Sequence, residues 1–209
     1  MLHKLKMLMG SGSVLGYFLQ ALPIACLVGI GFTVIRLIVL KKQHRRPEWP
    51  TELLRLLFVC YLTGLVSLVV LPANFWLYVY DGIFLGWWDE IGQILRIGEV
   101  NLIPTLIKWL NGELTIGNWV KTMLIGNIAM LIPFGFLLPL ALKGKSRRKI
   151  LLISGITPLC LESLQLFFGR SFDVDDLICN ALGIALGLAV AFAVRRLQTL
   201  RTAAECGES

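Results

Sequence analysis

The sequence predicts an all-α membrane protein, a polytopic bundle of about five transmembrane helices with an outer interfacial segment. Three properties of the 209-residue chain support this prediction: 56% of its residues are hydrophobic, 16% are charged, and its mean hydropathy is +0.76. A single soluble core does not need so much apolar sequence. A spanning helix needs roughly 20 mostly apolar residues, so the chain has room for about five. We therefore expect one integral membrane domain over residues 1–209.

Five apolar runs supply the expected helices. The first follows Lys4 and Lys6, which resemble the start of a signal peptide, but it is of spanning length and lacks an evident cleavage site. The second follows the basic loop KKQHRRPEWP and ends before Pro72, because proline breaks helices. The expected helices cover residues 14–40, 52–71, 120–142, 150–168 and 177–194.

The long connection at residues 73–119 is rich in tryptophan. Because tryptophan prefers the headgroup zone of a membrane, we expect this connection to be interfacial or re-entrant. Within it, WWDEIGQILRIG at residues 87–98 has a partly helical spacing and is too polar to span. The connection holds five of the six tryptophans: Trp76, Trp87, Trp88, Trp109 and Trp119.

The distribution of basic residues predicts the orientation. Lys and Arg are concentrated in loop 41–50, loop 143–149 and the C-terminal tail, which the positive-inside rule assigns to the cytoplasm. The net charge of +7 is therefore a topology signal, and we expect no nucleic-acid partner. The five cysteines have no paired spacing, so neither disulfides nor zinc are expected. The tryptophan-rich connection and the GRSFDVDD turn should face outward.

Polar residues gather at one depth of the expected bundle. Glu162 lies about 9 Å below the outer end of its helix, and Gln165 shares its helical face. Asn180 and Asn127 lie at a similar depth on the fifth and third helices. Ionisable residues inside a membrane are costly and mark functional sites. The sequence therefore predicts an outward-facing polar pocket, with Arg170, Asp173, Asp175 and Asp176 in the turn above it.

Structural explanations of these residues stay open beside the functional one. Asp175 and Asp176 suit a helix N-terminus, because a carboxylate there can cap free N–H groups and is stabilised by the positive end of the helix dipole. Arg170 could pair with Glu162 or an aspartate, and Asn127 could hold helices together by hydrogen bonding. Gly183 and Gly187 have the spacing of close helix packing, and the proline and glycine of IPFGF at residues 132–136 predict a kink.

Several motifs, in order, resemble those of the VanZ-like family of bacterial membrane proteins. They are NLIP, NIAMLIPFGFLLP and ESLQLFFGRSFDVDDLICNALG with the glycine that follows, and they cover about residues 99–188. The resemblance implies a multi-pass protein of the bacterial cytoplasmic membrane with a cytoplasmic C-terminus, in a family named for reduced susceptibility to the glycopeptide teicoplanin. The family's polar residues fall on Asn101, Asn127, Glu162, Gln165, Arg170, Asp173, Asp175, Asp176 and Asn180. The sequence departs from the family at Thr105 and Pro158, where an aromatic residue and a serine are common.

The favoured function is binding or modification of a lipid or lipid-linked envelope headgroup. Arg170 would bind phosphate, because a guanidinium makes paired, charge-assisted hydrogen bonds. Glu162 and Asp173 are the candidates for proton transfer if the protein is an enzyme that hydrolyses or transfers the headgroup. The other substrate-binding candidates are Gln165, Asn127, Asn180, Asp176 and Asn101.

Three alternatives remain. The tryptophan-rich outer face could bind an antibiotic or a cell-wall enzyme without catalysis. Asp173, Asp175 and Asp176 could hold a divalent cation, although the charge of Arg170 opposes this. Transport is weakly supported, since the sequence has no evident inverted repeat.

Overall fold

The computed structural model describes residues 7–89, 91, 96–111 and 117–207, without the side chains of residues 14, 106, 109–110, 118–122 and 201–207. Apart from two strands of two residues each, the regular secondary structure of these described ranges is helical. Of the predicted interfacial helix at residues 87–98, positions 90 and 92–95 lie outside the described residues, as do the side chains of Trp109 and Trp119.

Five of the described helices are long and apolar enough to cross a membrane, so the chain is a multi-pass membrane protein. This confirms the all-helical fold class predicted from hydropathy. The spans are Leu15–Lys42, Trp49–Val70, Met123–Ala141, Arg147–Phe167 and Val174–Leu200.

The chain divides into two compact units, which are described separately. Unit 1 consists of Met1–Leu102 and Cys160–Asp173, and unit 2 of Ile103–Leu159 and Val174–Ser209. The helix α8, Arg147–Phe167, runs from unit 2 into unit 1.

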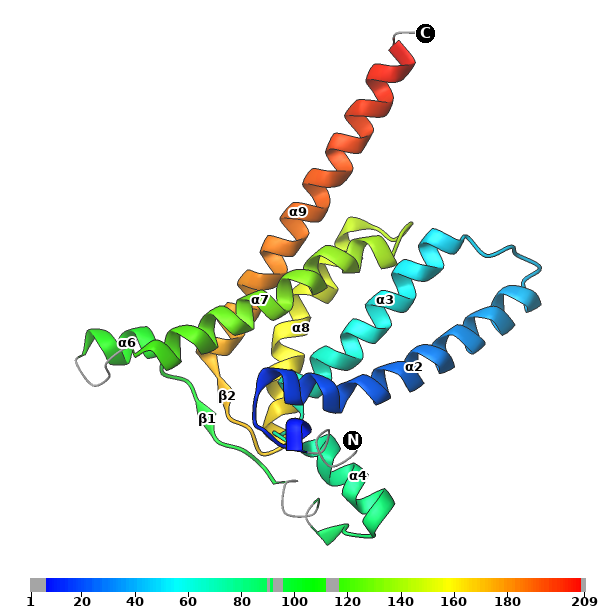
Figure 1. The fold of residues 1–209 in the computed structure, drawn as a ribbon. Coiled ribbons are helices and arrows are strands. Elements are labelled where there is room, and N and C mark those ends of the chain that lie inside the picture. The colour runs from blue at the N-terminus through cyan, green and yellow to red at the C-terminus, as the bar shows by residue number, and fades with distance from the viewer. Residues whose placement is uncertain (1–6, 90, 92–95, 112–116, 208–209) are drawn as a thin grey trace. The chain divides into compact units, whose positions relative to one another are not determined.

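Unit 1 begins with a helical hairpin (Figure 1). In α2, Val14–Lys42, the Ser13 hydroxyl caps the first turn by accepting a hydrogen bond of 3.1 Å from the Gly16 N–H. In α3, Trp49–Leu65, a proline stands in the first turn, where its missing N–H costs nothing. α3 continues into a π-helix, η1, at Val66–Val70. π-helical turns are rare in proteins, and those that do occur are frequently found at functional sites.

A buried polar contact joins α2 to the shorter helix α4, Phe75–Leu85. Gln20 is 3% exposed, and its Nε2 donates hydrogen bonds to the Met9 carbonyl (2.7 Å) and to Asn74 Oδ1 (2.9 Å). The Tyr80 hydroxyl donates to the Gln20 carbonyl at 2.7 Å. Burial raises the pKa of the Tyr80 phenol, so it remains a donor at neutral pH. α4 is too short to span a membrane.

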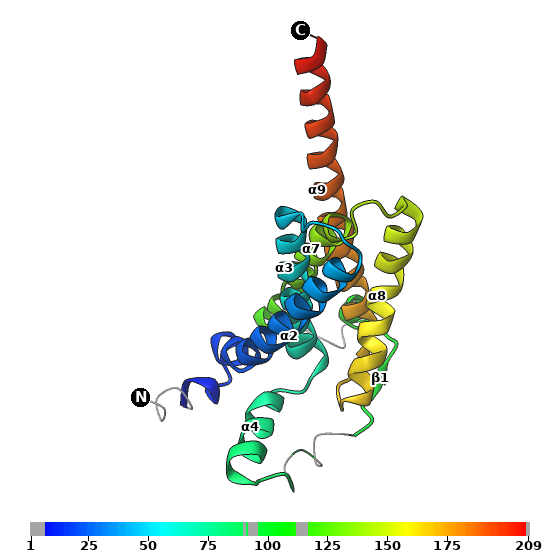
Figure 2. The same ribbon diagram turned by 90° about the vertical axis from the view of Figure 1, so that its right-hand side faces the viewer.

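In unit 2, helix α6, Thr105–Leu110, precedes α7, Asn118–Ala141, which crosses α9, Val174–Gly207 (Figures 1 and 2). A Cβ added at Gly183 would lie 2.3 Å from the Ile128 carbonyl oxygen, and one at Gly187 would lie 2.1 Å from that of Ile132. Glycine at both positions therefore lets the two backbones touch. This confirms the close packing predicted from the spacing of the two glycines.

The last helix is longer than predicted at both ends. α9 begins at Val174 and continues to Gly207, whereas the hydropathy pattern predicted residues 177–194. Hydropathy marks the apolar part of a helix, but charged residues such as Arg195 and Arg196 do not interrupt the backbone hydrogen bonds that continue it.

Candidate functional site

Two of the predicted site residues lie one turn apart in the C-terminal half of α8. Glu162 is 0% exposed and Gln165 is 2% exposed. Residues three apart on a helix share a face, so these two side chains project together as the sequence predicted. A buried carboxyl group in an apolar helix is expensive and needs hydrogen-bond partners.

The chain leaves α8 through a glycine turn that places Arg170. Gly169 has a φ of +74°, a left-handed conformation that glycine adopts without strain. The Arg170 N–H then reaches back to the Gln165 carbonyl at 3.0 Å, closing the end of the helix in the Schellman manner. The sequence Phe168-Gly169-Arg170 therefore ends the helix and places the Arg170 backbone next to the last turn of α8, which contains Gln165.

A short parallel bridge attaches the NLIP segment to this turn. Strand β1, Val100–Asn101, pairs with β2, Phe172–Asp173, so that Asn101 stands opposite Asp173. Beside it, the Gly98 N–H donates to the Leu166 carbonyl at 2.8 Å. A Cβ at Gly98 would lie 1.8 Å from the Arg170 carbonyl oxygen, so this approach requires glycine.

The bridge brings together three of the predicted site residues. Asn101 Nδ2 donates a hydrogen bond of 2.8 Å to Asp173 Oδ2. The Asp173 N–H donates to Glu162 Oε2 at 3.2 Å. Asn101, Glu162 and Asp173 therefore form one hydrogen-bonded cluster inside unit 1, built from strand β1, helix α8 and strand β2.

The Arg170 side chain binds the end of the π-helix. Its Nη1 donates to the carbonyl oxygens of Val69 at 2.6 Å and of Leu68 at 3.3 Å. These carbonyls belong to the last turn of η1. The carbonyl groups in the last turn of a helix have no N–H donors from the helix itself, so they can accept hydrogen bonds from other groups. Carbonyl oxygens position a guanidinium without cancelling its charge, and both of these hydrogen bonds are donated by Nη1.

The remaining predicted residues belong to unit 2. Asn127 Nδ2 on α7 donates a short hydrogen bond to Asp176 Oδ1 on α9. Asp175 Oδ2 accepts a hydrogen bond of 2.6 Å from the N–H of Thr105, the first residue of α6, and Asn180 is 1% exposed. The two carboxylates stand in the first turn of α9, where the helix dipole favours negative charge. That these residues share one pocket with Glu162 stays a prediction.

The metal alternative gains no support from this geometry. Among the described residues, no group of three or more His, Cys, Asp and Glu side chains is arranged to hold a metal ion. Asp176 instead accepts the amide hydrogen bond from Asn127, and Asp175 accepts a backbone N–H.

Sequence reasoning missed two features that shape the site. The carbonyl oxygens of Leu68 and Val69 have no side-chain signature, and nothing in VSLVV indicates a π-helix. Gly98 was an available signal, since a lone glycine beside a strand indicates close approach of another backbone segment.

Comparison with known proteins places the chain in a family. No curated protein and no solved structure matches it. A family comparison matches residues 58–195, which is more than half of the chain and includes Asn101 and every other candidate site residue. The chain belongs to the VanZ/LLP1 family.

Proposed function

We propose that this VanZ/LLP1-family membrane protein binds the phosphate of a lipid or lipid-linked envelope headgroup at Arg170 on the outer side of the membrane. Through this binding it would lower susceptibility to glycopeptide antibiotics such as teicoplanin. The observation that carries the proposal is the contact of Arg170 Nη1 with the Val69 and Leu68 carbonyls. This contact holds the guanidinium in place and preserves its charge for an anionic ligand.

The neighbouring cluster supports recognition of the headgroup. Asn101, Asp173 and Glu162 are joined by hydrogen bonds, so their side chains have defined positions before a ligand arrives. Preorganised polar groups bind a ligand at lower entropic cost than mobile ones. In an enzymatic form of the proposal, Glu162 or Asp173 would accept a proton from the water or hydroxyl whose oxygen bonds to phosphorus. The existing ester P–O bond would break, and the leaving oxygen would take up that proton and depart as an alcohol.

The decisive comparison uses Arg170→Gln with Arg96→Gln as a matched control, because Arg96 is an exposed arginine of the same unit. Folded yield in detergent, retention of lipid-linked precursor by native mass spectrometry, and teicoplanin susceptibility would be measured for both. We expect Arg170→Gln to keep most of the folded yield and to lose retention and resistance. Retention equal to that of Arg96→Gln would overturn the proposal.

Catalysis is tested separately. The purified protein would be incubated with lipid-linked precursor, and the products would be identified by mass spectrometry. A new headgroup that disappears in Glu162→Gln or Asp173→Asn establishes the enzymatic form. An unchanged precursor that nevertheless stays bound restricts the function to binding.

A second candidate function rests on the exposed apolar surface around α4. Ile83, Phe84, Trp87 and Trp88 are 60%, 79%, 57% and 53% exposed. Aromatic residues are enriched at protein interfaces, so this surface could contact the antibiotic or a cell-wall enzyme directly. In that case Phe84→Ser with Trp87→Ser would abolish resistance while leaving lipid retention unchanged, and Arg170→Gln would leave resistance intact.

A further inference from the structure

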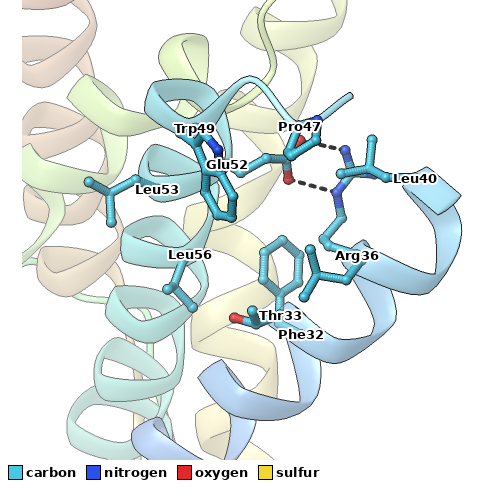
Figure 3. Close-up of a pocket in the computed structure, with 10 residues that line it drawn as sticks. Phe32, Thr33, Arg36, Leu40, Pro47, Trp49, Glu52, Leu53 and Leu56 are labelled. Carbon is cyan, nitrogen blue, oxygen red and sulfur yellow. Dashed lines mark hydrogen bonds and ion pairs between the residues drawn. The ribbon is translucent and has the colours of Figure 1, made fainter. Parts of the chain in front are cut away.

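A cavity of about 120 Å³ lies between α2 and α3, beside the loop that joins them (Figure 3). It belongs to unit 1 and lies before the family match, which begins at residue 58. Its wall is mainly apolar and has room for a few methylene groups. The apolar side chains of the wall are Phe32, Leu37, Leu40, Trp49, Leu53 and Leu56.

The rim of this cavity carries an unequal set of charges. Arg36 binds the Glu52 carboxylate with both ends of its fork, at 2.8 Å from Nε and 2.7 Å from Nη2 (Figure 3). Arg55 does not line the cavity, but its Nη1 donates to the same carboxylate at 2.5 Å. Both guanidinium groups thus contact one carboxylate. Over residues 36–55 the sequence has six Lys and Arg residues against two acidic ones, Glu48 and Glu52, so this part of the chain carries a net positive charge. The arginine side chains remain 28% and 30% exposed, while that of Glu52 is 14% exposed.

The loop next to the cavity adds further positive charge. Lys41, Lys42, Arg45 and Arg46 are all exposed, and within loop 41–50 Glu48 is the one acidic residue. Basic residues next to a membrane surface are attracted to its anionic lipids. Trp49 is 69% exposed at the cavity wall, and tryptophan favours the headgroup zone. Cavity, arginines and loop thus combine an apolar recess with a cationic rim at headgroup depth.

We propose that this groove is a binding site for one acidic phospholipid. Its phosphate contacts Arg36 at the rim and Arg55 on the other side of Glu52, and the upper part of one acyl chain enters the apolar cavity. The Glu52 carboxylate competes with the phosphate for the two guanidinium groups and reduces their combined charge. The acyl chain of a zwitterionic lipid fits the cavity equally well. Its headgroup binds the arginines more weakly, because the cation of that headgroup is repelled by their charge. The site is separate from Arg170 and does not depend on the function proposed for that residue.

The test compares lipid binding to the purified chain by native mass spectrometry. Phosphatidylglycerol and phosphatidylcholine with identical acyl chains are the probes, and soluble glycerol phosphate represents the headgroup alone. We expect the wild-type chain to prefer phosphatidylglycerol and to bind glycerol phosphate far more weakly. Equal binding of the two lipids would overturn the proposal, as would equal affinity for glycerol phosphate and phosphatidylglycerol.

Three substitutions locate the preference. Arg55→Gln leaves Glu52 paired with Arg36 and should lower phosphatidylglycerol binding about tenfold, which is the loss of one charge-assisted hydrogen bond. Glu52→Gln removes the competing carboxylate and should raise that binding. Leu53→Trp changes an exposed residue of the cavity wall and should weaken both lipids without affecting their ratio.

Arg148→Gln is the matched control, because it removes an exposed arginine from the other basic loop. A loss equal to that of Arg55→Gln would show general attraction to the membrane surface and would refute a site. If Arg55→Gln lowers the folded yield, Glu52→Gln decides the matter alone: weaker phosphatidylglycerol binding in that variant contradicts the proposal.

Discussion

The Arg170 side chain donates a hydrogen bond of 2.6 Å from Nη1 to the carbonyl oxygen of Val69, the next-to-last residue of the π-helix η1. The two residues are far apart in the sequence, and the bond ties the turn after α8 to the end of the second span. An arginine in this position both satisfies the end of a helix and presents a charge, so its two roles can be separated by substitution.

Arg170→Lys should separate those roles. Lysine keeps the positive charge and can bind one carbonyl, but it lacks the planar fork that binds phosphate through two hydrogen bonds. We expect a loss of about 1 kcal/mol in stability and about a tenfold loss in lipid retention. Thermal unfolding and native mass spectrometry measure the two quantities. Unchanged retention would mean that charge alone, and not the fork, binds the ligand.

Two substitutions of Glu162 should differ in stability. Glu162→Gln retains an oxygen that can accept the Asp173 N–H, whereas Glu162→Leu leaves that N–H without this acceptor. An unsatisfied buried donor costs about 1–3 kcal/mol, so the leucine variant should unfold at a clearly lower temperature. Equal unfolding temperatures would show that the hydrogen bond contributes nothing measurable.

Gly98→Ala should disrupt the bridge between β1 and β2. The added Cβ would lie 1.8 Å from the Arg170 carbonyl oxygen, so one of the two segments must move. Overpacking of this kind costs about 1–3 kcal/mol. Gly155→Ala on α8 is the control, because its Cβ would meet nothing within 4 Å. A thermal shift as small as that of the control would contradict the assigned approach.

Gly187→Ala should destabilise the crossing of α7 and α9. The new Cβ would lie 2.1 Å from the Ile132 carbonyl oxygen and 2.7 Å from the Phe136 nitrogen, and neither backbone atom can rotate away. We expect a loss of about 1–3 kcal/mol. Gly126→Ala, on the open side of α7, should be neutral or stabilising. Comparable unfolding temperatures for the two variants would exclude close packing at Gly187.

Asn127 and Asp176 should be energetically coupled. Their side chains share a hydrogen bond between α7 and α9, so Asn127→Ala and Asp176→Ala remove the same interaction. A double-mutant cycle measured by unfolding in detergent should give a coupling of about 1 kcal/mol, within the range found for hydrogen bonds between membrane helices. Strictly additive effects would show that the bond adds no stability.

Much of the fold was predictable because it depends on side-chain type. Runs of apolar residues predicted the five spans, and the spacing of Gly183 and Gly187 predicted the close packing of α7 and α9. The polar residues of the candidate site were also visible, because a carboxyl such as Glu162 stands out in an apolar helix. By itself, the sequence therefore determined the fold class and the residues worth testing.

The partners of those residues were decided by the tertiary structure. Arg170 binds the backbone carbonyls of Leu68 and Val69, and Asn101 reaches Asp173 because two short strands pair in parallel. Nearly every residue carries the same backbone carbonyl and amide groups. The residue type therefore does not indicate which carbonyl an arginine will bind or which segment a strand will pair with. Only the folded path of the chain selects these groups, and with them whether the arginine keeps a charge that a phosphate can use.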